Sequence, residues 1–192
     1  MITCDDLSRR RFLYASGSLV LGSALLQKNI LAQTNGNAYP RLKKAVQWNN
    51  LPKELSEIDR CKLAKDCGFD GIEIPPITKE DEAKRIFESA KKNQIEIHSI
   101  IYGGWDKPLS HPDPAIVEKG KGSIIQAIDL AKQVGAKTVL LVPAVVNEQV
   151  RYQDAWERSQ KNIKDLIPYA EKNQVIIAVE NVWNKFLLSP LD

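Results

Sequence analysis

Residues 90–97 read AKKNQIEI and residues 170–177 read AEKNQVII, so one helix-to-strand junction occurs twice in this chain. In both copies a charged, helix-forming stretch ends at Asn-Gln, and a run of β-branched residues follows directly. A repeated junction of this kind is typical of folds in which strands and helices alternate. The two copies therefore predict an α/β protein that is built from repeating units.

The same alternation extends outward from these junctions. Apolar runs typical of strands occupy residues 43–48, 71–74, 95–101, 137–143 and 175–180. Amphipathic segments between them predict helices over residues 52–67, 79–93, 115–134 and 153–172. We expect Leu55, Ile58, Leu63 and Ala64 to face the core from the first helix, and Ile163, Leu166 and Ile167 from the last. The later strands are continuous apolar runs, as expected when both faces of a strand are covered.

Alternating strands and helices can form an open doubly wound sheet or a closed barrel. No glycine-rich phosphate loop follows the first strand, where a dinucleotide-binding fold needs one. Polar residues lie instead at the carboxyl ends of strands, where barrel enzymes carry their active sites: Glu73, His98, Glu180 and Asn181. The predicted fold class is α/β, a (β/α)₈ TIM barrel that is incomplete here, with about five of eight βα units.

Composition narrows the class of protein. Of the 192 residues, 43% are hydrophobic and 27% are charged, which is typical of a soluble α/β protein. The formal net charge is +3, and four basic and two acidic residues place most of it in the first 32 residues. The remainder is nearly neutral, so we expect no nucleic-acid partner.

The first 32 residues are predicted to be an export signal. Residues 8–13 (SRRRFL) resemble the twin-arginine signature. The weakly apolar stretch after them, residues 13–26, is too short to span a bilayer comfortably, so we expect no stable membrane anchor after cleavage near Ala32. The alternative is a chance arginine run before an apolar helix. We expect a periplasmic or otherwise exported protein with a signal peptide (1–32), a linker (33–42) and a partial barrel domain (43–192).

The cysteines predict neither a disulfide nor a zinc site. Cys4 lies in the predicted signal, and Cys61 and Cys67 lie six positions apart in one predicted helix. That spacing puts the two side chains on different faces of the helix. We expect both to pack in the core.

Residues 179–190 (VENVWNKFLLSP) carry the strongest chemical signal. Glu180 ends an otherwise apolar strand, and a buried carboxylate is costly unless it contacts a metal ion or a hydrogen-bond network. Asn181, Trp183 and Asn184 come next, a set that can bind a hard cation and stack against a sugar. The alternative is a capping or salt-bridged glutamate, with Trp183 and Phe186 only covering the barrel.

Three further residues are candidates for substrate binding. His98 lies in the third strand, where it contacts substrate or is a satisfied core residue. Glu73 ends the second strand, where it contacts substrate or pairs with a neighbouring lysine. Trp105 lies in the long loop of residues 102–114 and either covers the substrate or packs within its loop. Other aromatic residues have structural expectations: Trp48 lines or fills the barrel mouth, Trp156 packs in the core and His111 is solvated.

Several stretches resemble the sugar phosphate isomerase/epimerase branch of the xylose isomerase-like barrel superfamily. They are residues 68–73 (GFDGIE), His98, residues 105–110 (WDKPLS), residues 135–140 (GAKTVL), residues 152–159 and residues 180–190. The last stretch is the most specific. The resemblance covers nearly all of the chain after residue 40.

The resemblance implies a metal-dependent isomerase or ketose 3-epimerase that acts on a sugar or a sugar phosphate. In that family a glutamate on strand five and another on strand eight bind Mn²⁺ or Mg²⁺ with an aspartate and a histidine from strands six and seven. The glutamates move a proton between adjacent ketose carbons through an enediolate. Glu180 matches the strand-five member and would be both ligand and acid/base. The other three ligands have no counterpart in this chain.

Two alternatives remain open. Class II apurinic endonucleases share the superfamily but bind three zinc ions through several histidines, whereas this chain has 2 histidines in all. That count disfavours the nuclease. A non-catalytic or inactive truncated sugar-binding barrel is the other alternative. Because five strands cannot close a barrel, we also expect exposed strand edges, poor solubility and a possible homo-oligomer.

Overall fold

The computed structural model describes residues 41–189. The predicted signal peptide and residues 33–40 of the predicted linker lie outside this range. The chain divides into two units, and the second, Lys43–Asp192, contains nearly all of the described residues. The second unit has the same bounds as the predicted barrel domain.

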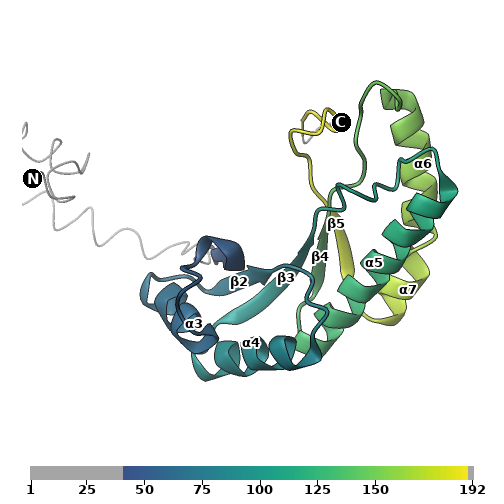
Figure 1. Ribbon diagram of the computed structural model, residues 1–192. Helices are drawn as coiled ribbons and strands as arrows, with labels where there is room; N and C mark the ends of the chain where they lie inside the picture. Colours follow the sequence, from purple (N-terminus) through teal and green to yellow (C-terminus); the bar gives the residue numbers. More distant parts are fainter. Residues whose placement is uncertain (1–40, 190–192) are drawn as a thin grey trace, which may run out of the picture. The chain divides into compact units, whose positions relative to one another are not determined.

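The second unit contains one sheet of five parallel strands in the order β1-β2-β3-β4-β5 (Figure 1). The strands are Ala45–Gln47 (β1), Gly71–Ile74 (β2), Glu96–Tyr102 (β3), Thr138–Leu141 (β4) and Ile176–Val179 (β5). Each strand pairs with its neighbour in sequence, which is the order of a barrel segment and not of a doubly wound sheet. The α/β prediction is confirmed. Among the described residues, β1 and β5 each pair on one side only.

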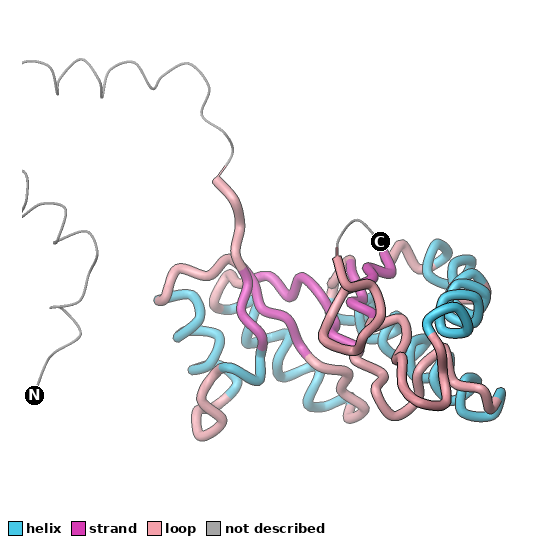
Figure 2. The backbone as a smooth tube through the Cα atoms, turned by 90° about the horizontal axis from the view of Figure 1, so that it is seen from above, coloured by secondary structure: helices cyan, strands magenta, loops and turns pink. Residues whose placement is uncertain are grey.

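The helices connect the strands and lie along one face of the sheet (Figures 1 and 2). They are Glu57–Asp66 (α3), Glu80–Lys92 (α4), Pro114–Val134 (α5), Tyr152–Lys164 (α6) and Ile167–Lys172 (α7), with a short 3₁₀ turn at Trp48–Asn50 (η2). Among the described residues, no helix is both long and apolar enough to cross a membrane.

The hydrophobic core lies between the sheet and these helices. Ile72, Ile100 and Val139 from the strands and Ile124 and Ile128 from α5 are fully buried. Burying one such side chain contributes roughly 1.5–3 kcal/mol, so this layer stabilises the unit. Successive residues of a strand point to opposite faces of the sheet. The strand residues that alternate with these core residues therefore lie on the face without helices, which we call the inner face. In register across the sheet, the inner face carries Gln47, Glu73, Ser99, Thr138 and Ile176.

The two repeated junctions fold alike. Asn93 and Asn173 cap the ends of α4 and α7, and each donates its side-chain amide to the carbonyl four residues earlier at 2.9 Å. The next residues, Gln94 and Gln174, have φ of 53° and 58°. Asn-Gln therefore ends each helix and turns the chain into the following strand, as the repeated sequence predicts.

Two predicted helices differ from the structure. The first begins at Glu57 and not at residue 52, because the Ser56 hydroxyl accepts from the Asp59 amide and caps the helix there. Leu55 consequently lies outside the helix and is exposed, contrary to prediction. The last predicted helix is divided into α6 and α7. Pro168 cannot donate to the carbonyl of Lys164, so α6 ends there and Ile167 is exposed.

The prediction for the cysteines is half right. Both Cys61 and Cys67 are free thiols, and Cys61 is completely buried on the core side of α3. Cys67 is exposed because it caps the end of α3, where the chain leaves the helix surface.

Candidate active site at the carboxyl ends of the strands

Glu180 directly follows β5, and its amide still donates to the Leu141 carbonyl of β4 at 3.0 Å. Its carboxylate is exposed and has no hydrogen-bond or ion-pair partner among the described residues. The prediction of a buried carboxylate is wrong. It assumed that both faces of β5 are covered, whereas Ile176 is 64% exposed and Val179 is 49% exposed. Glu180 is therefore a solvent-exposed carboxylate that no other described residue binds.

Trp105 and Trp183 form a stacked pair. Trp105 lies in the loop after β3 and Trp183 in the loop after β5, yet their ring centroids are 5.0 Å apart with an interplanar angle of 23°. Trp183 is 87% exposed and Trp105 is also exposed. Trp105 and Trp183, which were predicted separately, thus form one aromatic surface. Trp183 follows Glu180 by three positions in the chain. Such a surface can stack against the apolar face of a sugar ring.

Asn184 stabilises the loop after β5 and does not have the predicted role in substrate binding. Its side-chain amide donates to the Ala144 carbonyl, and its side-chain oxygen accepts from the Phe186 amide at 3.1 Å. Its own carbonyl accepts from the Val146 amide at 3.2 Å. The side chain is buried and bound at both ends, so it is not available to a substrate. Instead it ties the loop after β5 to the loop after β4.

A second tie joins the loops after β3 and β4. The buried Ser110 hydroxyl donates to the Val145 carbonyl at 3.3 Å and accepts from the Val145 amide at 3.1 Å. Beneath these loops lies a small apolar cluster of Ala144, Val150, Ala155 and Phe186, with Trp156 partly buried against it. Trp156 therefore packs as predicted, but in this satellite cluster and not in the main core. The three loops form one connected rim that holds Trp183 near Trp105.

Glu73 and His98 are in contact on the inner face. The imidazole Nε2 of His98 lies 3.0 Å from Glu73 Oε1, and the Ser99 hydroxyl donates to the same oxygen at 2.7 Å. The expected lysine partner of Glu73 is replaced by this histidine. Ser99 was not predicted, because an alternating strand would place it on the face opposite to His98.

A cavity of about 110 Å³ lies at the carboxyl ends of β1 to β3 and is lined by Gln47, Trp48, Asn49, Glu73, Pro75 and Ile101. Trp48 is buried, with the Arg60 guanidinium 3.7 Å from its ring centroid, so it forms a fixed wall. His111 is half-buried and accepts from the Asp113 amide through Nδ1 at 2.9 Å, so it is solvated only in part. His111 holds the turn that leads into α5.

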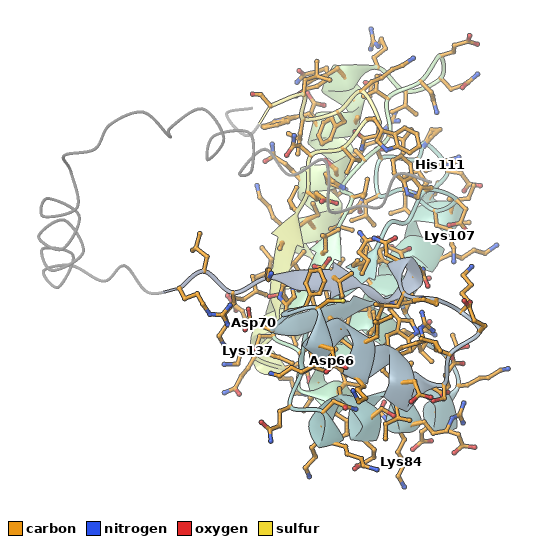
Figure 3. The ribbon with its side chains drawn as sticks, turned by 90° about the vertical axis from the view of Figure 1, so that its left-hand side faces the viewer. Asp66, Asp70, Lys84, Lys107, His111 and Lys137 are labelled. Carbon is orange, nitrogen blue, oxygen red and sulfur yellow. The ribbon has the colours of Figure 1, made fainter. Side chains whose placement is uncertain are left out.

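Figure 3 shows where charged groups lie relative to this end of the sheet. Lys107 and His111 lie in the loop after β3, on the side of the candidate site. Asp70 and Lys137, which precede β2 and β4, lie away from it. The two ends of the sheet thus carry different charged groups. His98 does not lie at the carboxyl end of its strand as predicted, because it is the third residue of β3 and lines a pocket with Ala45, Gly71 and Glu96 at the amino ends of the strands.

The described residues supply one candidate metal ligand and not a complete set. Residues 41–189 contain no group of three or more His, Cys, Asp or Glu side chains that could hold a metal ion. Glu180 alone has a free carboxylate at the predicted position. A Mg²⁺ or Mn²⁺ ion needs several oxygen or nitrogen ligands, so Glu180 fits as one member of a set.

Comparison with known proteins relates the chain to sugar epimerases. The family model described as xylose isomerase-like TIM barrel matches residues 61–190. A Haemophilus influenzae protein, provisionally named L-ribulose-5-phosphate 3-epimerase, is 28% identical over 151 residues, covering 72% of this chain and 52% of the relative. The L-ribulose-5-phosphate 3-epimerase of Escherichia coli is 25% identical over 141 residues, covering 68% and 50%. The chain spans about half the length of these relatives.

Solved structures share the fold at lower identity. An L-ribulose 3-epimerase superposes with a TM-score of 0.64 at 20% identity, covering 74% of this chain and 50% of that structure. A 3-keto-D-glucoside 4-epimerase from Escherichia coli superposes with a TM-score of 0.63 at 15% identity, covering 74% and 57%. These structures support an incomplete barrel, with five strands in the order that a barrel requires.

Proposed function

The chain belongs to the xylose isomerase-like TIM barrel family, and on that premise we propose that the protein is a sugar isomerase or epimerase. The named relatives support this, since they are epimerases of ribulose phosphate, ribulose and a keto-glucoside. In ribulose the carbonyl is at carbon 2, so a 3-epimerase inverts the adjacent carbon. A hydrogen next to a carbonyl is removed as a proton because the remaining charge is delocalised onto the oxygen. The reaction therefore needs a base near that carbon.

The observation that carries the proposal is the free carboxylate of Glu180. It lies at the carboxyl end of a parallel strand, where barrel enzymes place their chemistry, and no described residue binds it. A carboxylate without a partner can accept a proton from a substrate carbon, and inversion of that carbon then needs a second acid that delivers a proton to the opposite face. We assign removal of the proton to Glu180 Oε1 or Oε2, the two equivalent atoms of the group.

A divalent cation, Mn²⁺ or Mg²⁺, is part of the proposal. Glu180 fits as one oxygen ligand, and the remaining ligands would lie outside residues 41–189. When bound, the ion would polarise the carbonyl oxygen of the sugar and stabilise negative charge on it. Glu180 would be one of the residues that hold this ion.

The neighbouring side chains would orient the sugar. The Trp105–Trp183 surface offers an apolar face for the C–H side of the sugar. Asn181 is exposed directly beside Glu180 and offers an amide to a sugar hydroxyl. Glu73 and His98 lie three and two strands away from β5, so they would contact a different part of the same substrate.

The test is a matched pair of substitutions in the complete natural polypeptide that carries this chain. Glu180→Gln should abolish epimerisation of ketoses and ketose phosphates in the presence of Mn²⁺, because an amide is neither a base nor an anionic ligand. Glu171→Gln changes an exposed, unpartnered glutamate on α7 and should leave turnover unchanged. Full turnover by Glu180→Gln would reject Glu180 as the acid/base residue.

We also propose that the protein is exported by the twin-arginine route, on the strength of residues 8–13. These residues lie outside the described range. Replacing both Arg9 and Arg10 by lysine should retain the protein in the cytoplasm, whereas Arg11→Lys should not. Export that continues after the double replacement would reject the proposal.

A further inference from the structure

The Glu73 carboxylate is held through one oxygen and leaves the other free. His98 Nε2 and the Ser99 hydroxyl both contact Oε1, at 3.0 and 2.7 Å. Ser99 is 1% exposed, so its hydroxyl cannot exchange this bond for one to water. No described residue contacts Oε2. The carboxylate is therefore fixed in orientation, with one acceptor oxygen available.

A β-bulge produces this arrangement. The register of β2 and β3 shifts between Ile72 and Glu73, so that Ile72 pairs with Ile97 and Glu73 pairs with Ser99. His98 is the extra residue, and it contacts Glu73 from the same side as Ser99. In a regular strand, only one of these two neighbours could face Glu73. Bulges that redirect a side chain in this way are frequent next to active sites.

Glu73 also lines the cavity at the ends of β1 to β3. Its wall contains one large aromatic ring (Trp48), two uncharged amides (Gln47 and Asn49) and one carboxylate (Glu73). An apolar wall with a few fixed polar groups is the usual chemistry of a small-ligand pocket. Among the described residues, the lining contains no lysine or arginine. Arg60 is not in the lining, and its guanidinium is engaged with the Trp48 ring and carbonyl.

We propose that this cavity binds the end of the sugar remote from the reacting carbons, and that this end carries an uncharged hydroxyl and not a phosphate. Glu73 accepts a hydrogen bond from that hydroxyl, and Ser99 is a positioning residue that acts through Glu73. A phosphate here would face a fixed carboxylate with no lysine or arginine among the described lining residues, and like charges at contact are strongly unfavourable. The inference rests on the proposed function and narrows its substrate class to unphosphorylated sugars.

The test compares L-ribulose with L-ribulose 5-phosphate in the complete polypeptide. The natural protein should prefer ribulose, measured both as kcat/KM and as affinity by calorimetry. Glu73→Gln removes the charge but keeps the shape, so it should reduce that preference by roughly tenfold, which corresponds to about 1.4 kcal/mol. Ser99→Ala should raise KM for ribulose with little change in kcat, and Ser99→Thr should restore it.

Thr138→Ala is the matched control, because Thr138 is the neighbour of Ser99 in register on the inner face but makes no bond to Glu73. It should leave the preference unchanged. Two results would overturn the inference: the natural protein uses ribulose 5-phosphate as well as or better than ribulose, or Glu73→Gln leaves the preference unchanged. If Glu180→Gln still abolishes turnover, the proposed function stands and only this inference fails. Absence of turnover with these two sugars and with the other ketoses and ketose phosphates would reject the proposed function and this inference together.

Discussion

Trp105 and Trp183 stack with their ring centroids 5.0 Å apart, although they belong to loops that follow different strands. The contact joins the loop after β3 to the segment directly following Glu180. Asn184 fixes the other side of that segment to the loop after β4. The free carboxylate of Glu180 is thus followed by a segment that is anchored at two points, so that the Trp105–Trp183 surface and the Glu180 carboxylate have a defined relation.

The tryptophan pair should be visible by far-ultraviolet circular dichroism. Stacked indoles couple electronically, so Trp105→Ala and Trp183→Ala should each remove the same exciton signal. Each should also weaken sugar binding by about 0.5–1.5 kcal/mol, the usual contribution of an aromatic contact beyond its buried area. Trp156→Phe should retain the signal, since Trp156 packs against Phe186 elsewhere. A signal that survives loss of Trp183 would disprove the stack.

Asn184→Ala should lower the free energy of unfolding by about 1–3 kcal/mol, because it leaves the buried Ala144 carbonyl and Phe186 amide without partners. Urea denaturation measures this change. Asn181→Ala is the matched control three positions earlier, and as an exposed substitution it should change stability by less than about 0.5 kcal/mol. Equal effects of the two substitutions would mean that Asn184 does not tie the loops together.

Two glycines in α5 should respond to alanine in opposite directions. A Cβ at Gly120 would collide with the Lys107 carbonyl, so Gly120→Ala must displace the loop that carries Trp105. A Cβ at Gly122 would meet no atom within 4 Å, so Gly122→Ala should stabilise the helix by roughly 0.5–1 kcal/mol. Thermal unfolding of both variants gives the two signs. A loss of stability in Gly122→Ala would contradict the prediction.

The two described cysteines should differ in reactivity with pH. Burial raises the pKa of the Cys61 thiol to about 11, so it stays protonated in the folded protein at pH 8. The thiolate is the reactive form, and Cys67 is exposed. Iodoacetamide at pH 8 should therefore label Cys67 rapidly and Cys61 only after unfolding, as read by peptide mass spectrometry. Folded protein that is labelled equally at both positions would show that α3 does not bury Cys61.

Local patterns in the sequence were sufficient for the strands and the repeated junctions. Apolar runs and Asn-Gln turns are properties of neighbouring residues, so β2 to β5 and the ends of α4 and α7 could be located from them. The division of the last helix was also readable at Pro168, but the apolar spacing across it suggested a continuous helix. Contacts between distant segments carry no such local signal.

Prediction of the candidate site from the sequence was limited in the same way. Glu73, Trp105 and Trp183 could be named from their places at strand ends and in loops, but the pairs that they form could not. His98 was expected at the carboxyl end of its strand, whereas it lies near the amino end of β3. Ser99 reaches Glu73 only because a bulge shifts the register, and Asn184 binds backbone groups of another loop. The burial of Glu180 was wrongly expected because an apolar strand was taken to be covered on both faces. These outcomes depend on tertiary structure and not on residue type.

The most direct test of the central claim is solvent deuterium incorporation into a ketose. In D₂O with Mn²⁺, the complete polypeptide should place deuterium on the carbon next to the carbonyl, because Glu180 removes that proton and a deuteron from solvent replaces it. The signal should persist in Glu171→Gln and vanish in Glu180→Gln. Deuterium incorporation at an undiminished rate in Glu180→Gln would show that another group takes the proton and that Glu180 is not the base.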